Sequence, residues 1–231
     1  MTRRIDKLSS RFWSPDSGPY VLLACLFVTA FILAPLLSAR LVVPLILEVA
    51  FSLILVAGTF GVTSRASLRL FALIIASLSP ALRWLGVSIS GKTVVAADLL
   101  ISVGMLAFCA LLTFVSFVVR GRVTAHRISG AVAVYLLLGL IWARLYEVVE
   151  LLSPGAFHTL QGESLNAAGM TYFSFVTLAT MGYGDITPIN IVARNLAVLE
   201  AVTGQLFLVI LISRLVSEGS AKRDKIEMDE S

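Results

Sequence analysis

The chain has 231 residues, of which 58% are hydrophobic and 14% are charged. Soluble globular domains carry about 45–50% apolar and about 25% charged residues, so this composition excludes an ordinary soluble domain and indicates an integral membrane protein. Lys and Arg number 18 against 14 Asp and Glu, a formal charge of +4. In a membrane protein such cations mark topology. We therefore expect a lipid bilayer, and no nucleic acid, as a partner.

Apolar runs long enough for a helix to cross about 30 Å of hydrocarbon recur along the whole chain. After an N-terminal segment over residues 1–19, the candidate spans are Tyr20–Ser38, Leu41–Val62, Leu68–Gly86, Val94–Val119, Ile128–Val149 and Ile191–Val216. The third run is weaker because Arg69, Pro80 and Arg83 interrupt it. Its alternative is an interfacial or re-entrant helix.

The basic residues favour six spans with both termini in the cytoplasm, because Lys and Arg gather in short cytoplasmic loops. If residues 68–86 did not cross, Arg120, Arg122 and Arg127 would face outward. We therefore predict an all-α membrane protein with six transmembrane helices. Its compactness and the absence of a targeting segment favour the bacterial inner membrane.

The longest connection follows Ile128–Val149 and contains its own apolar segment, Ala167–Ala179, which is too short to cross the membrane. Non-helical backbone at membrane depth is tolerated only where it is packed in protein or lines a water-filled path. We predict a re-entrant helix here, beside a path for something polar.

The segment Thr180-Met181-Gly182-Tyr183-Gly184-Asp185 follows this helix. It resembles the selectivity filter of tetrameric potassium channels, usually Thr-Val-Gly-Tyr-Gly-Asp, and the resemblance extends over Ile128–Val216. It implies that carbonyl oxygens of residues 180–183 and the Thr180 hydroxyl bind K+ as the permeant ion. The glycines allow the backbone angles that turn these carbonyls toward one axis. One copy per chain implies a homotetramer.

The same resemblance assigns filter support to Thr177, Tyr172, Phe173 and Asp185. Many relatives carry consecutive Trp residues where Tyr172 and Phe173 stand. Tyr172 keeps a hydroxyl donor, whereas Phe173 cannot hydrogen-bond to the back of the filter. The rigidity of the filter is therefore an open question.

In the last helix, Gly204 falls at the hinge position of the family. Glycine inside a helix costs about 1 kcal/mol relative to alanine, so its presence needs a reason. We favour a bend over the alternative, close packing of small residues. By helical spacing, Gln205, Leu208 and Ile212 share the pore-facing stripe below it.

The apolar runs, together with the resemblance over Ile128–Val216, predict successive parts of the chain. These are a cytoplasmic N-terminal segment (1–19), a four-helix transmembrane domain (20–119), a pore domain (120–217) with outer helix 128–149, pore helix 167–179, filter 180–185 and inner helix 191–217, and a short, solvated, mobile cytoplasmic tail (218–231). Voltage sensing needs roughly 3–4 gating charges per subunit. Residues 94–119 contain no Lys or Arg, so we predict weak or absent voltage dependence.

Several charged residues lie in apolar surroundings outside the filter. We expect Glu48, Arg83 and Asp98 to form a structural cluster, with an extracellular proton sensor as the alternative. Arg144 and Glu147 have the spacing of a local ion pair on one helix face. A further carboxyl, that of Glu200, is placed to brace the re-entrant helix.

The sequence therefore predicts passive, potassium-selective permeation. The alternatives are a weakly selective cation channel, a secondary transporter and a non-conducting scaffold subunit. Transporters commonly repeat broken helices in two halves, and only one broken segment is found here. The sequence shows no phosphate loop, paired catalytic carboxylates or metal-ligand cluster, so we expect neither enzymatic activity nor a cofactor. A regulatory subunit is left open.

Overall fold

The computed structural model describes residues 92–115, 125–160, 162 and 165–229, together with Leu23, Ala24, Leu26, Phe27 and Leu70. Its elements in chain order are α6 (Lys92–Thr113), α7 (Ala125–Leu152), β1 (Phe157–Thr159), α8 (Ala167–Leu178), β2 (Ile186–Pro188) and α9 (Ile191–Asp229). Apart from those five positions, the first three expected spans lie outside the described residues, as do Glu48 and Arg83.

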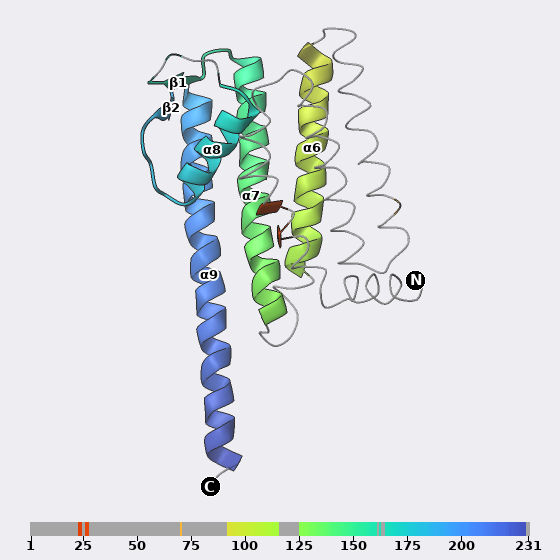
Figure 1. Cartoon of the computed structure of the whole chain (residues 1–231), viewed down its shortest axis with the longest axis vertical. Coiled ribbons are helices and arrows are strands. Elements are labelled where there is room, and N and C mark those ends of the chain that lie inside the picture. The colour runs from red at the N-terminus through yellow and green to blue at the C-terminus, as the bar shows by residue number, and fades with distance from the viewer. Residues whose placement is uncertain are drawn as a thin grey trace, which may run out of the picture.

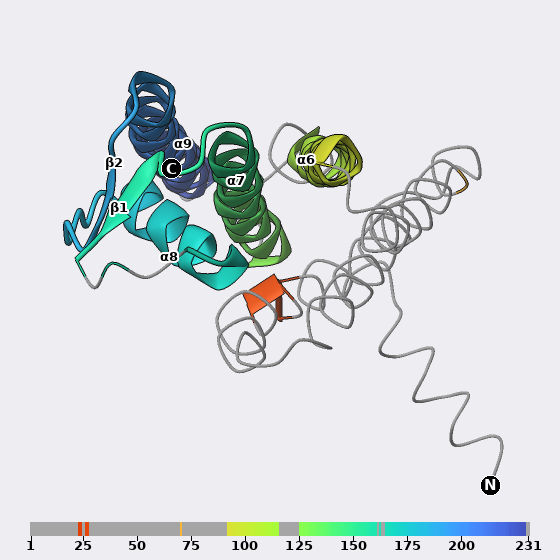
Figure 2. The ribbon, with the colours of Figure 1, turned by 90° about the horizontal axis from the view of Figure 1, so that it is seen from above.

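Three long helices stand side by side, with α7 between α6 and α9 (Figures 1 and 2). The segments Lys92–Thr113, Arg127–Leu152 and Ile191–Arg214 are long and apolar enough to cross a membrane. They correspond to the last three spans that the sequence predicts. Periodic apolar runs of this length are the strongest signal that a single sequence carries.

The contact between α6 and α7 is an apolar core. Met105, Leu106 and Cys109 of α6 are buried together with Ala133 and Leu137 of α7. Small side chains such as alanine let membrane helices approach closely, so that larger neighbours fill the remaining space. This contact joins the segment before residue 116 to the helices that carry the candidate site.

Helix α8 is short and lies beside the upper parts of α7 and α9, at the same end of the molecule as β1 and β2 (Figures 1 and 2). It begins at Asn166, whose side chain accepts a hydrogen bond from the Gly169 N–H at 2.9 Å. This is an ordinary N-cap. Twelve residues rise only about 18 Å, which is too short to cross a membrane. Its bounds agree with the predicted helix 167–179 to within one residue.

A two-stranded antiparallel ribbon is the one departure from an all-helical architecture among the described residues. β1 pairs with β2 so that Phe157 lies opposite Pro188 and His158 opposite Thr187. The purely all-α prediction overlooked this ribbon because three-residue strands are too short to leave a readable alternation. The ribbon ties the loop after α7 to the chain that leaves the filter.

Helix α9 continues without interruption to Asp229. We expected the chain after Ser217 to be solvated and mobile; its backbone is helical as far as Asp229, and its mobility stays a prediction. Eight of the 14 residues from 218 to 231 are Glu, Lys, Ala, Arg or Met, which are all strong helix formers. A helix that is already nucleated in the apolar span is extended by such residues at little cost.

Candidate functional site

Thr180, the first residue of the segment 180–185 that is predicted to be the filter and is called the filter below, follows the C-cap of α8. The Thr180 N–H donates to the Thr177 carbonyl at 2.9 Å, and the Met181 N–H donates to the Val176 carbonyl at 2.8 Å. These two bonds form a Schellman motif, which places the residue after the helix cap in the left-handed region. That residue is Thr180, with φ of 55°. For a residue other than glycine this costs about 1–2 kcal/mol, so the cap holds Thr180 in a strained conformation.

The left-handed conformation recurs at every second residue of the filter. φ is 55° at Thr180, 56° at Gly182 and 76° at Gly184, whereas Met181 and Tyr183 have ordinary negative values. Glycine adopts positive φ without steric penalty. A backbone that alternates in the sign of φ turns successive carbonyl groups toward one side, unlike a β-strand, where they alternate. The filter is therefore irregular in a way that favours a row of oxygen atoms.

The filter side chains find little cover within a single chain. Met181 is 59% exposed and Tyr183 is 65% exposed. Apart from the two adjoining residues of the chain, no atom lies within 4 Å of the position that a Cβ atom would occupy at Gly182 or Gly184. These two large side chains are therefore uncovered in the single chain.

The C-terminal end of the filter is held through Asp185. The Tyr172 hydroxyl donates to Asp185 Oδ2 at 2.7 Å, and the Leu160 N–H donates to the Asp185 carbonyl at 3.1 Å. The hydrogen bond to Asp185 raises the pKa of Tyr172 to about 12, because the phenol must keep its proton to donate. Backbone and side chain of Asp185 are therefore both held.

Phe173, next to Tyr172 in the chain, takes a different role. Its ring lies in the core behind α8, where it makes edge-on contacts with Tyr146 at 5.0 Å and with Phe157 at 5.4 Å between ring centroids. Such edge-to-face pairs are favourable for aromatic rings. Tyr172 therefore contacts the end of the filter at Asp185, whereas Phe173 packs between α7, α8 and β1.

At the inner end of α8, the Leu178 carbonyl is approached from two helices. The Tyr135 hydroxyl of α7 donates to it at 3.2 Å. On α9, a Cβ atom added at Gly204 would overlap the same oxygen and would come 3.0 Å from Leu178 Cδ1. Close packing, the alternative that the sequence analysis ranked second, therefore explains the glycine. The helix runs on through Gly204, and a hinge there stays a prediction.

The face of α9 below Gly204 is uncovered. Leu208 is 41% exposed, Ile212 is 57% exposed and Gln205 is also exposed. These are the three residues that helical spacing places on one stripe. Their assignment as pore-lining residues stays a prediction, since the described chain contains one subunit.

Behind the filter, Glu200 is fully buried and connects three helices. Its Oε2 accepts a hydrogen bond from the Tyr146 hydroxyl of α7. Its Oε1 lies 2.5 Å from Ser174 Oγ on α8. Glu200 therefore contacts α8 as predicted, whereas the re-entrant position of α8 in a membrane stays a prediction. Tyr146 and Ser174 were not singled out in the sequence, because their partner lies far away along the chain.

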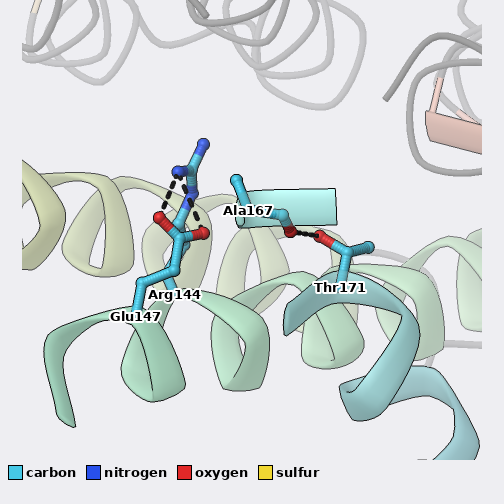
Figure 3. A network of polar contacts seen from close by, with 4 residues as sticks. All are labelled: Arg144, Glu147, Ala167 and Thr171. Carbon is cyan, nitrogen blue, oxygen red and sulfur yellow. Dashed lines mark hydrogen bonds and ion pairs between the residues drawn. The ribbon is translucent and has the colours of Figure 1, made fainter. Parts of the chain in front are cut away.

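The charged residues of α7 form the expected local ion pair. Arg144 Nη1 and Glu147 Oε2 lie 3.2 Å apart (Figure 3). Figure 3 also shows the Thr171 hydroxyl, which donates to the Ala167 carbonyl at 2.8 Å in the first turn of α8. Asp98 of α6 is buried. The partners expected for it, Glu48 and Arg83, lie outside the described residues, so that cluster stays a prediction.

The segment that contains α8 and the filter is similar to known proteins. Residues 130–220 match a protein family described as ion channel. This segment carries an ion-channel domain. The family is one of channels, not of enzymes, and together with the three long apolar helices it makes the chain an integral membrane protein.

Two curated relatives match parts of the domain. Two pore potassium channel c of Oryza sativa subsp. japonica is 41% identical over 64 residues, which is 28% of this chain and 14% of that protein. Two-pore potassium channel 4 of Arabidopsis thaliana is 38% identical over 58 residues, 25% of this chain and 20% of that protein. The chain thus spans a fifth or less of these relatives. No solved structure matches it significantly.

Proposed function

We propose that the chain is a subunit of a homotetrameric channel that conducts K+ passively and selectively. The observation that carries the proposal is the alternation of positive φ at Thr180, Gly182 and Gly184, in a segment that begins as the cap of a re-entrant helix. Two proteins with similar segments are potassium channels, which supports the choice of ion. The permeant ion is the substrate and no cofactor is needed.

The ion-binding step follows from the filter backbone. Carbonyl oxygens of Thr180, Met181, Gly182 and Tyr183, with the Thr180 hydroxyl, replace the water shell of K+. Because these ligands are carbonyls, the methionine at residue 181 alters the packing behind the filter more than the ligand set. The C-terminal end of α8 carries the negative end of the helix dipole, and its capped carbonyls face the start of the filter. A cation at that point is stabilised.

A fourfold assembly is supported by the surfaces that one chain leaves open. Only Ala193, Glu200 and Gly204 are buried in the apolar stretch Ile191–Arg214, and Met181 and Tyr183 project from the filter. One chain supplies oxygen atoms on only one side of an ion, whereas complete coordination requires a ring. Four copies around an axis close such rings and cover the filter side chains at the same time.

The remaining features of the proposal concern topology. The proposed protein crosses the bacterial inner membrane six times and has both termini in the cytoplasm. With this topology, the end of the molecule that contains α8 lies on the side of the membrane away from the cytoplasm. The first four spans then surround the pore domain. The fourth, represented by α6, has no Lys or Arg between Thr93 and Val115, which supports a channel without a voltage sensor of its own.

The test is the reversal potential of the purified protein in planar bilayers, with K+ on one side and Na+ on the other. We expect a shift toward the K+ equilibrium potential that is lost in Gly182→Ala, because alanine is disfavoured at φ of 56°. Gly104→Ala on α6 is the matched control, since nothing lies within 4 Å of its added Cβ. Equal permeation of both ions would favour a weakly selective cation channel. Well-folded but silent tetramers would point to a scaffold subunit.

A further inference from the structure

A chain of polar contacts crosses the molecule behind the filter. It runs from the Tyr146 hydroxyl to Glu200 Oε2, from Glu200 Oε1 to Ser174 Oγ at 2.5 Å, and from Ser174 Oγ to the Gly139 carbonyl at 2.6 Å. It joins α7 to α9, α9 to α8, and α8 back to α7. The side chains of Glu200, Ser174 and Tyr146 each have 0% relative exposure, so water does not complete the pattern.

The number of hydrogens available to these three polar contacts determines the protonation state of Glu200. Three oxygen–oxygen contacts need three hydrogens. The Tyr146 and Ser174 hydroxyls supply one each, whereas a carbonyl and an ionised carboxylate supply none. With Glu200 ionised, Ser174 donates either to Glu200 or to Gly139, and the other contact becomes two oxygens facing each other without a hydrogen. A proton on Glu200 Oε1 removes this conflict.

The charges around Glu200 agree with a neutral group. Among the described residues, the titratable groups that face it are Tyr146 and Tyr135 of α7. Helix α8 carries no Asp, Glu, His, Lys or Arg. Arg144 of α7 forms its ion pair with Glu147, and Arg194 of α9 donates to the Pro188 carbonyl. A buried carboxylate without a cation is strongly unfavourable.

We propose that Glu200 acts as a neutral carboxylic acid that positions the pore helix. It donates its proton to Ser174, which frees the Ser174 hydroxyl to donate to Gly139 and so holds α8 against both flanking helices. When Glu200 loses that proton, Ser174 must give up one partner, and the link between α8 and α7 or between α8 and α9 is lost. The filter begins at the cap of this same helix, so conduction depends on the proton.

The protonation state can be tested without any current, which separates this inference from the proposed function on which its role in conduction rests. We expect the infrared spectrum of the purified full-length protein to contain a carboxylic-acid carbonyl band that disappears in Glu200→Gln. Glu147→Gln is the matched control, because Glu147 is paired with Arg144 and its substitution should leave that band unchanged. A difference spectrum that shows only carboxylate bands at Glu200 would overturn the proposal.

The positioning role is tested by currents in the same bilayers. The amide of Glu200→Gln donates to Ser174 and accepts from Tyr146, as the neutral acid does, so its K+ current should stay within about twofold of wild type. Glu200→Ala removes both partners and should lower the current about tenfold or more. In wild type, the acid band and the current should fall together as pH rises, whereas the current of Glu200→Gln should not change.

Two outcomes would contradict this role. The first is loss of conduction in a tetrameric Glu200→Gln protein, which would show that a negative charge is needed. The second is an alkaline loss of current that persists in Glu200→Gln, which would assign the pH effect to another group. If no variant conducts, the proposed function fails, while the infrared result still decides whether Glu200 carries the proton.

Discussion

Gly204 of α9 lies directly against the Leu178 carbonyl at the end of α8, with no room for a methyl group between them. The contact joins the inner helix to the helix that carries the filter. It also explains why a residue with poor helix propensity stands in the middle of a long helix.

We expect Gly204→Ala to destabilise the folded subunit by about 1–3 kcal/mol, the usual cost of overpacking a close contact. The clash is with backbone, so a side-chain rotation cannot relieve it. Thermal unfolding in detergent measures the effect. In Gly104→Ala the added methyl group meets no atom within 4 Å, so that variant should be neutral or slightly more stable. Equal melting temperatures for the two variants would contradict a packing role for Gly204.

Thr180→Gly should separate backbone strain from ion coordination. Glycine relieves the left-handed strain at residue 180, a gain of about 1–2 kcal/mol, which the greater freedom of glycine in the unfolded chain partly offsets. The Thr180 hydroxyl is lost at the same time. We therefore expect unchanged or higher thermal stability together with reduced K+ selectivity. Thr180→Ser keeps the hydroxyl and should retain selectivity; a loss as large as that in the glycine variant would argue against hydroxyl coordination.

Tyr172→Phe should loosen the outer end of the filter. It removes one hydrogen bond to Asp185, worth about 0.5–1.5 kcal/mol, and should reduce the K+ over Na+ permeability ratio or its persistence during prolonged recording. Asp185→Asn keeps an acceptor oxygen and should have the smaller effect. The reverse order would show that the charge of Asp185, and not the hydrogen bond, matters.

The same bond makes a prediction about pH. In the folded protein the pKa of Tyr172 is raised to about 12. The stability that its hydrogen bond to Asp185 contributes is therefore fully present below the ordinary pKa of tyrosine and is lost as pH rises through about 12. Alkaline titration of tyrosine absorbance should therefore show a late-titrating group that is missing in Tyr172→Phe. Identical titration curves for the two proteins would contradict the bond.

Voltage should have little effect on opening. Helix α6 has no basic residue after Lys92 at its start, so the described part of the fourth span has no cation for the field to move. Conductance measured in symmetric, blocker-free solutions should vary only weakly with voltage. A steep curve under those conditions would require gating charges elsewhere in the chain.

The long described helices and α8 were predictable from the sequence, whereas the contacts between them were not, apart from that of Glu200 with α8. Apolar runs of about 20 residues average out local irregularity, and the glycines at residues 182 and 184 mark the end of the short apolar segment that forms α8. Ser174 is different. A serine in an apolar helix gives no hint that its partners lie 26 and 35 residues away.

Thr180 and Gly204 show the same limit in other ways. A threonine where a helix cap usually has glycine carries no sequence signal for left-handed backbone. At Gly204 two physical reasons for a glycine were available, and only coordinates show that a neighbouring carbonyl occupies the space. The β1–β2 ribbon was missed because each strand has three residues.

Helix α9 has 39 residues and therefore extends about 58 Å, almost twice the about 30 Å thickness of the hydrocarbon layer. Its first turn lies next to the strand that leaves the filter, and its last turn lies well beyond the apolar span. The helix is continuous along this whole length. Its close contact with α8 lies at Gly204, which packs against Leu178. A displacement of the part beyond the apolar span is therefore transmitted along one continuous helix to the Leu178 carbonyl, which borders the filter segment.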